Sequence, residues 1–183
     1  MNNVKKLTKD IFLFTDLFDD LNQTYLYLQE LDWQLWGRNN NDPAYKIGEL
    51  AYLNKHKKLL DIIKPVTEKC IYSYMNELNI DSSLHVFYPE STYVRKWDFP
   101  MRGMNAHSDY TFNDDGSIRD VEYTLCGYLN DNYIGGLLEF PEHGISLKPP
   151  AGSAVVFPSY EVHLVTDLVE GHRYMWSDFV FKK

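Results

Sequence analysis

The chain has 183 residues, of which 44% are hydrophobic, so it can form one compact domain with a core but leaves little room for a second. Acidic residues outnumber basic ones by 26 to 18, the net charge is -8, and no basic stripe could follow a phosphate backbone. These numbers exclude nucleic acid as an expected partner. The apolar run at residues 11–14 is too short for a signal peptide or a membrane span. Cys70 and Cys126 lack metal-ligand spacing, so we expect a cytoplasmic protein with reduced thiols and no membrane contact.

Helical periodicity marks the N-terminal part of the chain. Between residues 16 and 32 the apolar positions recur at steps of four, four, three and three, at Leu17, Leu21, Tyr25, Leu28 and Leu31. Asp16 or Thr15 would cap this helix, and the turn-rich residues 35–44 would close it. A second helical stripe runs from residue 50 to residue 75, with Pro65 either kinking it or opening a new helix. We therefore expect residues 1–80 to be a helical support.

The pattern changes at about residue 84, where short runs of β-branched and aromatic residues alternate with turns. The expected strands are 84–88, 92–97, 121–129, 137–140, 145–147, 154–158, 163–168 and 173–181. Turns are expected at Gly135-Gly136, in the Pro-rich residues 149–152 and in the Asn- and Asp-rich residues 113–116. So many short strands predict a mainly β (α+β) fold. We expect residues 1–183 to form a single domain, with a jelly-roll or double-stranded β-helix core at residues 84–183 and helices before it.

The pair His107 and Asp109 places an imidazole and a carboxylate two residues apart, on one face of a strand end, where they could share a metal ion. About 0.5 such pairs are expected by chance among six histidines. A histidine and an acid hydrogen-bonded at a strand end is therefore the alternative interpretation of this pair alone.

A third histidine and an arginine strengthen the metal hypothesis. His163 follows the buried run 154–158, and Arg173 stands ten residues after it. Two histidines and one carboxylate leave open coordination positions, the arrangement with which iron(II) oxygenases take a co-substrate together with O₂. A dianionic co-substrate needs a buried cation, and the planar guanidinium of Arg173 is suited to pair with a carboxylate.

From residue 12 to residue 181 the sequence resembles the 2-oxoglutarate/iron(II) dioxygenases, and within them the prolyl 4-hydroxylase-like group. The family pattern is matched in order by His107-x-Asp109, Tyr128-Leu129-Asn130, Gly135-Gly136-Leu137, Pro150-Ala151-Gly152, His163 and Arg173. The resemblance implies a dioxygenase with iron(II) bound by His107, Asp109 and His163. It also implies 2-oxoglutarate and O₂ as co-substrates, with ascorbate as an optional further cofactor.

The resemblance further implies a role for Tyr128, whose hydroxyl would meet the distal carboxylate of 2-oxoglutarate beside Arg173. A tyrosine packed in the core is the alternative. Trp97 departs from the family pattern, which often has a tyrosine about ten residues before the first metal histidine. Residues 98–105 are expected to form a lid-like loop, and Tyr93, Trp97 and Met104 are the candidate substrate contacts.

The activity expected from the resemblance is hydroxylation of a C–H bond, with release of succinate and CO₂. Peptidyl proline is the first candidate substrate, and a free amino acid or other small molecule is the second.

A nucleic-acid demethylase would be expected to carry a second arginine where Phe179 stands. A non-catalytic cupin-like module that binds a metal or ligand would need neither Arg173 nor Tyr128. A zinc hydrolase would need a general base that the sequence does not offer.

Overall fold

Two β-sheets face each other in the computed structural model, which describes residues 3–36, 48–88, 92–99, 102–109 and 121–183. The nine strands of the larger sheet are, in spatial order, β1 (Asn3–Lys6), β2 (Phe12–Thr15), β12 (Ser153–Pro158), β8 (Val121–Tyr128), β15 (His172–Lys182), β6 (Tyr93–Asp98), β4 (Gly48–Tyr52) and β3 (Gln34–Trp36), with β5 (His85–Phe87) pairing with β15. The smaller sheet has the order β11 (Ile145–Leu147), β10 (Leu138–Phe140), β13 (His163–Val165) and β7 (Met104–His107). A further pair joins β14 (Leu168–Glu170) to β9 (Ile134–Gly135). This mainly β architecture confirms the predicted fold class.

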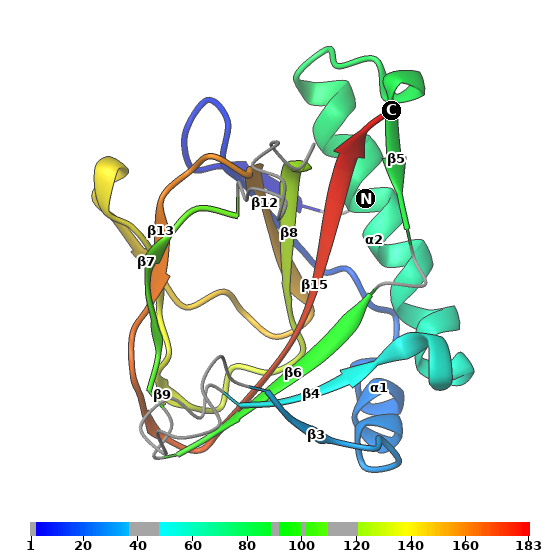
Figure 1. The fold of residues 1–183 in the computed structure, drawn as a ribbon, viewed down its shortest axis with the longest axis vertical. Helices are drawn as coiled ribbons and strands as arrows, with labels where there is room; N and C mark the ends of the chain where they lie inside the picture. Colours follow the sequence, from blue (N-terminus) through cyan, green and yellow to red (C-terminus); the bar gives the residue numbers. More distant parts are fainter. Residues whose placement is uncertain (1–2, 37–47, 89–91, 100–101, 110–120) are drawn as a thin grey trace, which may run out of the picture.

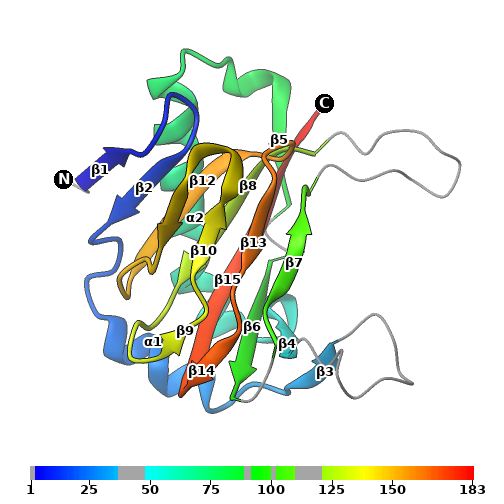
Figure 2. The same cartoon turned by 90° about the vertical axis from the view of Figure 1, so that its left-hand side faces the viewer.

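Helices cover the outer face of the larger sheet, on the side away from β7 and β13 (Figures 1 and 2). They are α1 (Leu21–Leu28) and α2 (Lys57–Glu77). Short 3₁₀ turns lie at Leu53–Lys55 and Ser82–Leu84, and a third, Pro141–His143, connects β10 to β11 in the smaller sheet. Buried residues of α2, among them Ile63 and Tyr74, pack with Leu125 and Trp176 of the sheet in one apolar cluster. The indole Nε1 of Trp176 donates to Thr67 Oγ1 of α2 at 2.9 Å. No helix in the described part of the chain has the length and apolar character of a membrane span.

The prediction of an entirely helical segment at residues 1–80 is wrong, because four strands lie in it. Phe12 and Phe14 alternate with half-buried neighbours along β2, which pairs with β12. The sheet holds the chain up to Thr15, so α1 begins at Leu21 and its cap is Asp20, not Thr15 or Asp16. The expected second helix likewise starts later, because Gly48–Tyr52 pairs with β6 as β4. Pro65 lies inside an unbroken α2.

In the C-terminal part most of the expected strands are present, with two differences. Residues 98–105 were expected to be a loop, but β7 begins at Met104 and runs to His107. The expected strand 163–168 is divided into β13 and β14. The expected turn at residues 113–116 lies outside the described residues.

The register between three neighbouring strands fixes which side chains line the inner face of the larger sheet. Along β15, Arg173 lies opposite Trp97 and Met175 lies opposite Arg95, both on β6. On its other side, Met175 lies opposite Tyr128 of β8. Because side chains alternate along a strand, these residues project to the same face, toward the smaller sheet. The sheet therefore presents an array of two arginines, a tyrosine, a tryptophan and a methionine to the space between the two layers.

Gly127 is a position where the helix-covered outer face of the larger sheet allows no side chain. A Cβ added there would overlap the indole ring of Trp176 on the neighbouring strand. We expect Gly127→Ala to lower the free energy of unfolding by about 1–3 kcal/mol, because the buried indole has to move. Chemical denaturation would measure the loss. Gly144→Ala is the matched control, since a Cβ there meets nothing within 4 Å and only the left-handed φ of 62° opposes it. Equal stability of Gly127→Ala and the unmodified protein would contradict this packing.

Candidate metal centre

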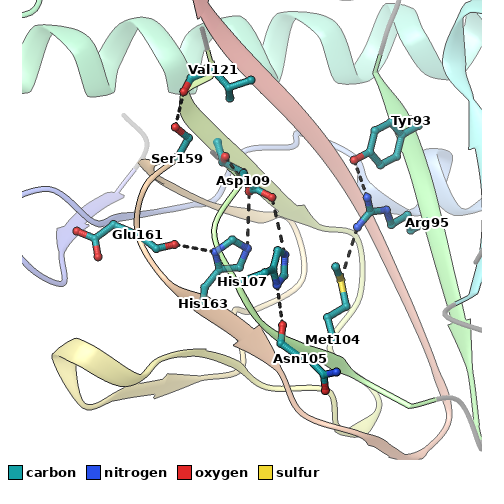
Figure 3. Close-up of polar contacts among 11 residues, drawn as sticks. Tyr93, Arg95, Met104, Asn105, His107, Asp109, Val121, Ser159, Glu161 and His163 are labelled. Atoms are coloured by element: carbon teal, nitrogen blue, oxygen red, sulfur yellow. Dashed lines mark hydrogen bonds and ion pairs between the residues drawn. The ribbon is translucent and has the colours of Figure 1, made fainter. Parts of the chain in front are cut away.

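Three predicted metal ligands come together between the sheets. His107 ends β7 and His163 begins β13, and the two are register partners in the smaller sheet. Asp109 follows two residues after His107, and its backbone N–H donates to the Ser159 carbonyl at 2.9 Å. One ligand atom from each of the three residues lies within 4.8 Å of the other two. Figure 3 shows both imidazoles pointing toward the Asp109 carboxylate.

Backbone carbonyls fix the orientation of both imidazoles. Nδ1 of His107 is 2.7 Å from the Asn105 carbonyl, and Nδ1 of His163 is 3.0 Å from the Glu161 carbonyl. Each Nδ1 must therefore carry the proton and donate it, which leaves Nε2 with a free lone pair. The Nε2 atoms lie 3.8 Å and 3.7 Å from the carboxylate oxygens of Asp109. This is the arrangement that a divalent metal ion bound by two imidazoles and one carboxylate requires.

The surroundings of the three ligands also suit a metal ion. The hydroxyl of Thr124 on β8 donates to Asp109 Oδ2 at 2.8 Å and holds the carboxylate in place. Burial lowers the pKa of His163, which favours the neutral imidazole that a metal needs. Cys126 lies in the same cavity, but burial raises the pKa of its thiol to about 12. Cys126 is therefore a protonated thiol near neutral pH, and it is not in the group of three residues whose ligand atoms lie within 4.8 Å of one another.

Arg173 lies deeper in the fold and is almost completely buried, with 1% of its surface exposed. Its Nη1 donates to the Gly136 carbonyl at 2.8 Å, and its guanidinium stacks on the Trp97 ring at 4.1 Å. Gly136 has a left-handed φ of 59°, and a Cβ there would contact Arg173 Cδ at 3.4 Å. Burial lowers the pKa of Arg173, but a guanidinium keeps its charge even so.

Polar atoms around Arg173 lack hydrogen-bond partners among the described residues. They are Arg173 Nε, Trp97 Nε1 and the Tyr133 hydroxyl. Buried donors are rarely left unsatisfied, so orphaned groups beside a buried guanidinium indicate a place for an anionic ligand. Tyr128 is 1% exposed and lines the cavity that also holds the metal ligands. The residues present therefore fit a small carboxylate that reaches from the metal ligands toward Arg173.

The three predicted substrate contacts lie in different places. Tyr93 and Met104 line the cavity with the metal ligands. Trp97 is 2% exposed and packs on Arg173, and it is not among the residues that line the cavity with the metal ligands. Two phenols line the cavity, that of Tyr128 and that of Tyr93, four residues before Trp97.

Sequence reasoning missed four residues of the site: Arg95, Thr124, Cys126 and Tyr133. The first three could have been found, because Arg95 alternates with Tyr93 and Trp97 on one expected strand, and Thr124 and Cys126 alternate with Tyr128 on another. Tyr133 follows the end of β8 and precedes β9, where no periodicity marks its direction.

Comparison with known proteins agrees with this geometry. The model of the 2OG-Fe(II) oxygenase superfamily matches residues 98–181. A PKHD-type hydroxylase from Hyphomonas neptunium is 36% identical over 63 residues, which are 33% of this chain and 28% of that relative. The chain thus matches less than a third of the length of this curated relative.

Two solved structures share the fold over nearly the whole chain. A viral collagen prolyl hydroxylase from Paramecium Bursaria Chlorella virus-1 has a TM-score of 0.64 at 15% identity, with 94% of this chain and 96% of that chain covered. A prolyl hydroxylase from Trichoplax adhaerens, solved with a hypoxia inducible factor peptide fragment, has a TM-score of 0.67 at 18% identity, with 96% and 84% covered. At these identities the likeness is one of fold. The part of the chain that matches the 2OG-Fe(II) oxygenase superfamily, residues 98–181, contains His107, Asp109, His163 and Arg173.

Proposed function

We propose that this protein is an iron(II)- and 2-oxoglutarate-dependent dioxygenase that hydroxylates a C–H bond, with peptidyl proline as the first candidate substrate. The observation that carries the proposal is the meeting of His107, Asp109 and His163 in one cavity, next to buried Arg173, whose Nη2 donates to the sulfur of Met175 on the wall of that cavity. Iron(II) and 2-oxoglutarate are the cofactors typical of the superfamily. A binding module without turnover would have no use for the buried guanidinium.

In this proposal the imidazoles of His107 and His163 and the carboxylate of Asp109 would hold the iron. Bound iron(II) and 2-oxoglutarate supply the oxidising chemistry, in which O₂ is consumed, succinate and CO₂ are released and a hydroxyl group is transferred to the substrate. Arg173 pairs with the distal carboxylate of 2-oxoglutarate, and Tyr128 donates its hydroxyl to the same group. The apolar walls of the cavity, such as Leu138 and Val165, exclude water from the reacting atoms.

The substrate class rests on the resemblance to prolyl hydroxylases. The viral structure is described as a collagen prolyl hydroxylase, and the Trichoplax structure holds a peptide. A free amino acid or another small molecule is the second candidate. One observation favours it, namely the guanidinium of Arg95 in the same cavity as the metal ligands.

Succinate formation tests the proposed function. Purified protein with iron(II), 2-oxoglutarate, ascorbate and air would be given a panel of proline-containing peptides and free amino acids. We expect succinate to rise above the substrate-free rate with at least one member, and mass spectrometry should then find a product 16 Da heavier. Peptides alone as active members would support the first candidate. No stimulation by any peptide or amino acid would count against both substrate classes.

A further inference from the structure

A second guanidinium, besides the one assigned to 2-oxoglutarate, lies on the inner face of the larger sheet. Arg95 is the third residue of β6 and lines the cavity together with His107, Asp109 and His163. Its Nη2 donates to the Tyr93 hydroxyl at 2.7 Å, and its Nη1 lies 3.8 Å from the Met104 sulfur. Figure 3 shows Arg95 between these two side chains, on the cavity side of β6.

The strand register separates Arg95 from Arg173. Arg95 lies opposite Met175, whereas Arg173 lies opposite Trp97, two residues further along β6. The indole of Trp97 stands near both guanidiniums, at 5.8 Å from Arg95 and 4.1 Å from Arg173. The two cations therefore occupy separate positions in the array. A dicarboxylate that reaches from the iron to Arg173 would leave Arg95 to another group in the same cavity.

The immediate contacts of Arg95 orient it for an anion. The phenol of Tyr93 holds one Nη, and the Tyr93 ring lies under the guanidinium at 4.7 Å. The other Nη lies against a thioether, which is a weak acceptor. A carboxylate is a stronger acceptor for a guanidinium, and the planar fork of arginine matches its two oxygens.

We propose that Arg95, oriented by Tyr93, binds a carboxylate of the primary substrate and so places the target C–H bond in front of the metal. This inference rests on the proposed function and narrows its substrate class to molecules that carry an acid group close to the oxidised carbon. The carboxylate can belong to a free amino acid or to an acidic or C-terminal residue of a peptide. Both sources present the same group to Arg95, and the experiment below separates them.

The test compares acids with their amides, using the iron(II)–2-oxoglutarate form of the full chain without O₂. Calorimetry would measure the binding of each free amino acid against its amide, of N-acetyl-L-proline against N-acetyl-L-prolinamide, and of Glu-Pro peptides against Gln-Pro peptides. We expect at least one acid to bind about tenfold or more tightly than its amide, the effect of one charge-assisted bidentate contact. Preference among free amino acids would identify a small-molecule source, and preference among peptides would identify an acidic residue.

Variants assign that preference to Arg95. In Arg95→Met the acid and its amide should bind equally, whereas Arg95→Lys should keep part of the preference. Tyr93→Phe, which retains the ring and removes the hydroxyl, should reduce the preference without abolishing it. Lys96→Met is the matched control, because Lys96 is the next residue on β6 and pairs with Glu49 at 3.1 Å and with Asp98 at 2.7 Å. Its acid preference should equal that of the unmodified chain.

Three results would overturn the inference: no acid that binds more tightly than its amide, a preference that survives in Arg95→Met, or loss of 2-oxoglutarate binding in Arg95→Met. The last result would assign Arg95 to the co-substrate. The visible absorption of the iron(II)–2-oxoglutarate form separates these failures from failure of the proposed function. If the unmodified protein lacks that absorption, the oxygenase proposal itself is wrong. If the absorption is present without an acid preference, only the role of Arg95 is wrong.

Discussion

Iron(II) and 2-oxoglutarate added without O₂ should give the intact protein a weak visible absorption, and His107→Ala and Asp109→Ala should abolish it. The absorption arises when 2-oxoglutarate chelates an iron ion that the protein holds. His107 and Asp109 supply two of the three donor groups that lie within 4.8 Å of one another. Either change removes a donor, and we expect metal affinity to fall by a factor of about 100 or more, since even mutation of an outer partner costs 10- to 100-fold. Anaerobic titration in a spectrophotometer measures the effect.

A matched histidine variant controls for nonspecific loss. His56 precedes α2 and its side chain makes no capping hydrogen bond, so His56→Ala removes an imidazole without touching the cavity. Its absorption should equal that of the unmodified protein. Asp109→Asn keeps the size of the side chain and its contact with Thr124 but removes the charge, and it should also lose the absorption. Persistence of the absorption in His107→Ala or Asp109→Ala would refute the assigned metal ligands.

Arg173→Ala should raise the concentration of 2-oxoglutarate needed for half-maximal absorption by about 30-fold or more, with iron binding largely retained. Removal of one partner of a buried charge pair costs about 2–5 kcal/mol, and every 1.4 kcal/mol is a factor of ten in affinity. Arg173 is 1% exposed, so water cannot readily replace its guanidinium. Titrations with 2-oxoglutarate at saturating iron(II), and with iron(II) alone by calorimetry, give the two affinities separately.

Two further variants divide this effect into charge and hydrogen bonding. Arg173→Lys should keep part of the affinity, because an ammonium group pairs with the carboxylate but cannot offer a planar fork. Tyr128→Phe removes only a hydroxyl and should cost about tenfold. Equal 2-oxoglutarate affinities in Arg173→Ala and in the unmodified protein would show that Arg173 does not bind the co-substrate.

Much of the site could be predicted from the sequence because its residues lie at fixed places in strands. His163 and Arg173 stand ten residues apart, and the chain between them forms β13, β14 and the start of β15. Their spacing in the sequence therefore sets their relative positions in the fold. The pair His107 and Asp109 alone is nearly expected by chance, and it indicates a metal site only together with His163 and Arg173. Tyr128 was found through the family pattern and lies in the same cavity.

The parts that could not be predicted depend on tertiary pairing. β2 and β4 have only 4 and 5 residues, and their partners β12 and β6 come much later in the chain. Runs that short carry too little periodicity to separate a strand from a helix, so the helical stripe around them misled the prediction. The place of Trp97 on Arg173 also follows from pairing, since it depends on the register between β6 and β15.

The position of β7 has a consequence for the protein before it has taken up its metal. Among the described strands β7 is the outer member of the smaller sheet, and its ladder to β13 has two register pairs with an irregularity between them. One of those pairs is His107 with His163. A metal ion held by both imidazoles would therefore crosslink β7 to β13, where only two register pairs join the strands. At a metal concentration 100 times the dissociation constant, such a crosslink adds about 2.7 kcal/mol to folding stability. Without the crosslink, the outer strand β7 is more readily available as a template for pairing with other chains, so we expect the metal-free protein to aggregate more readily than the metal-bound protein.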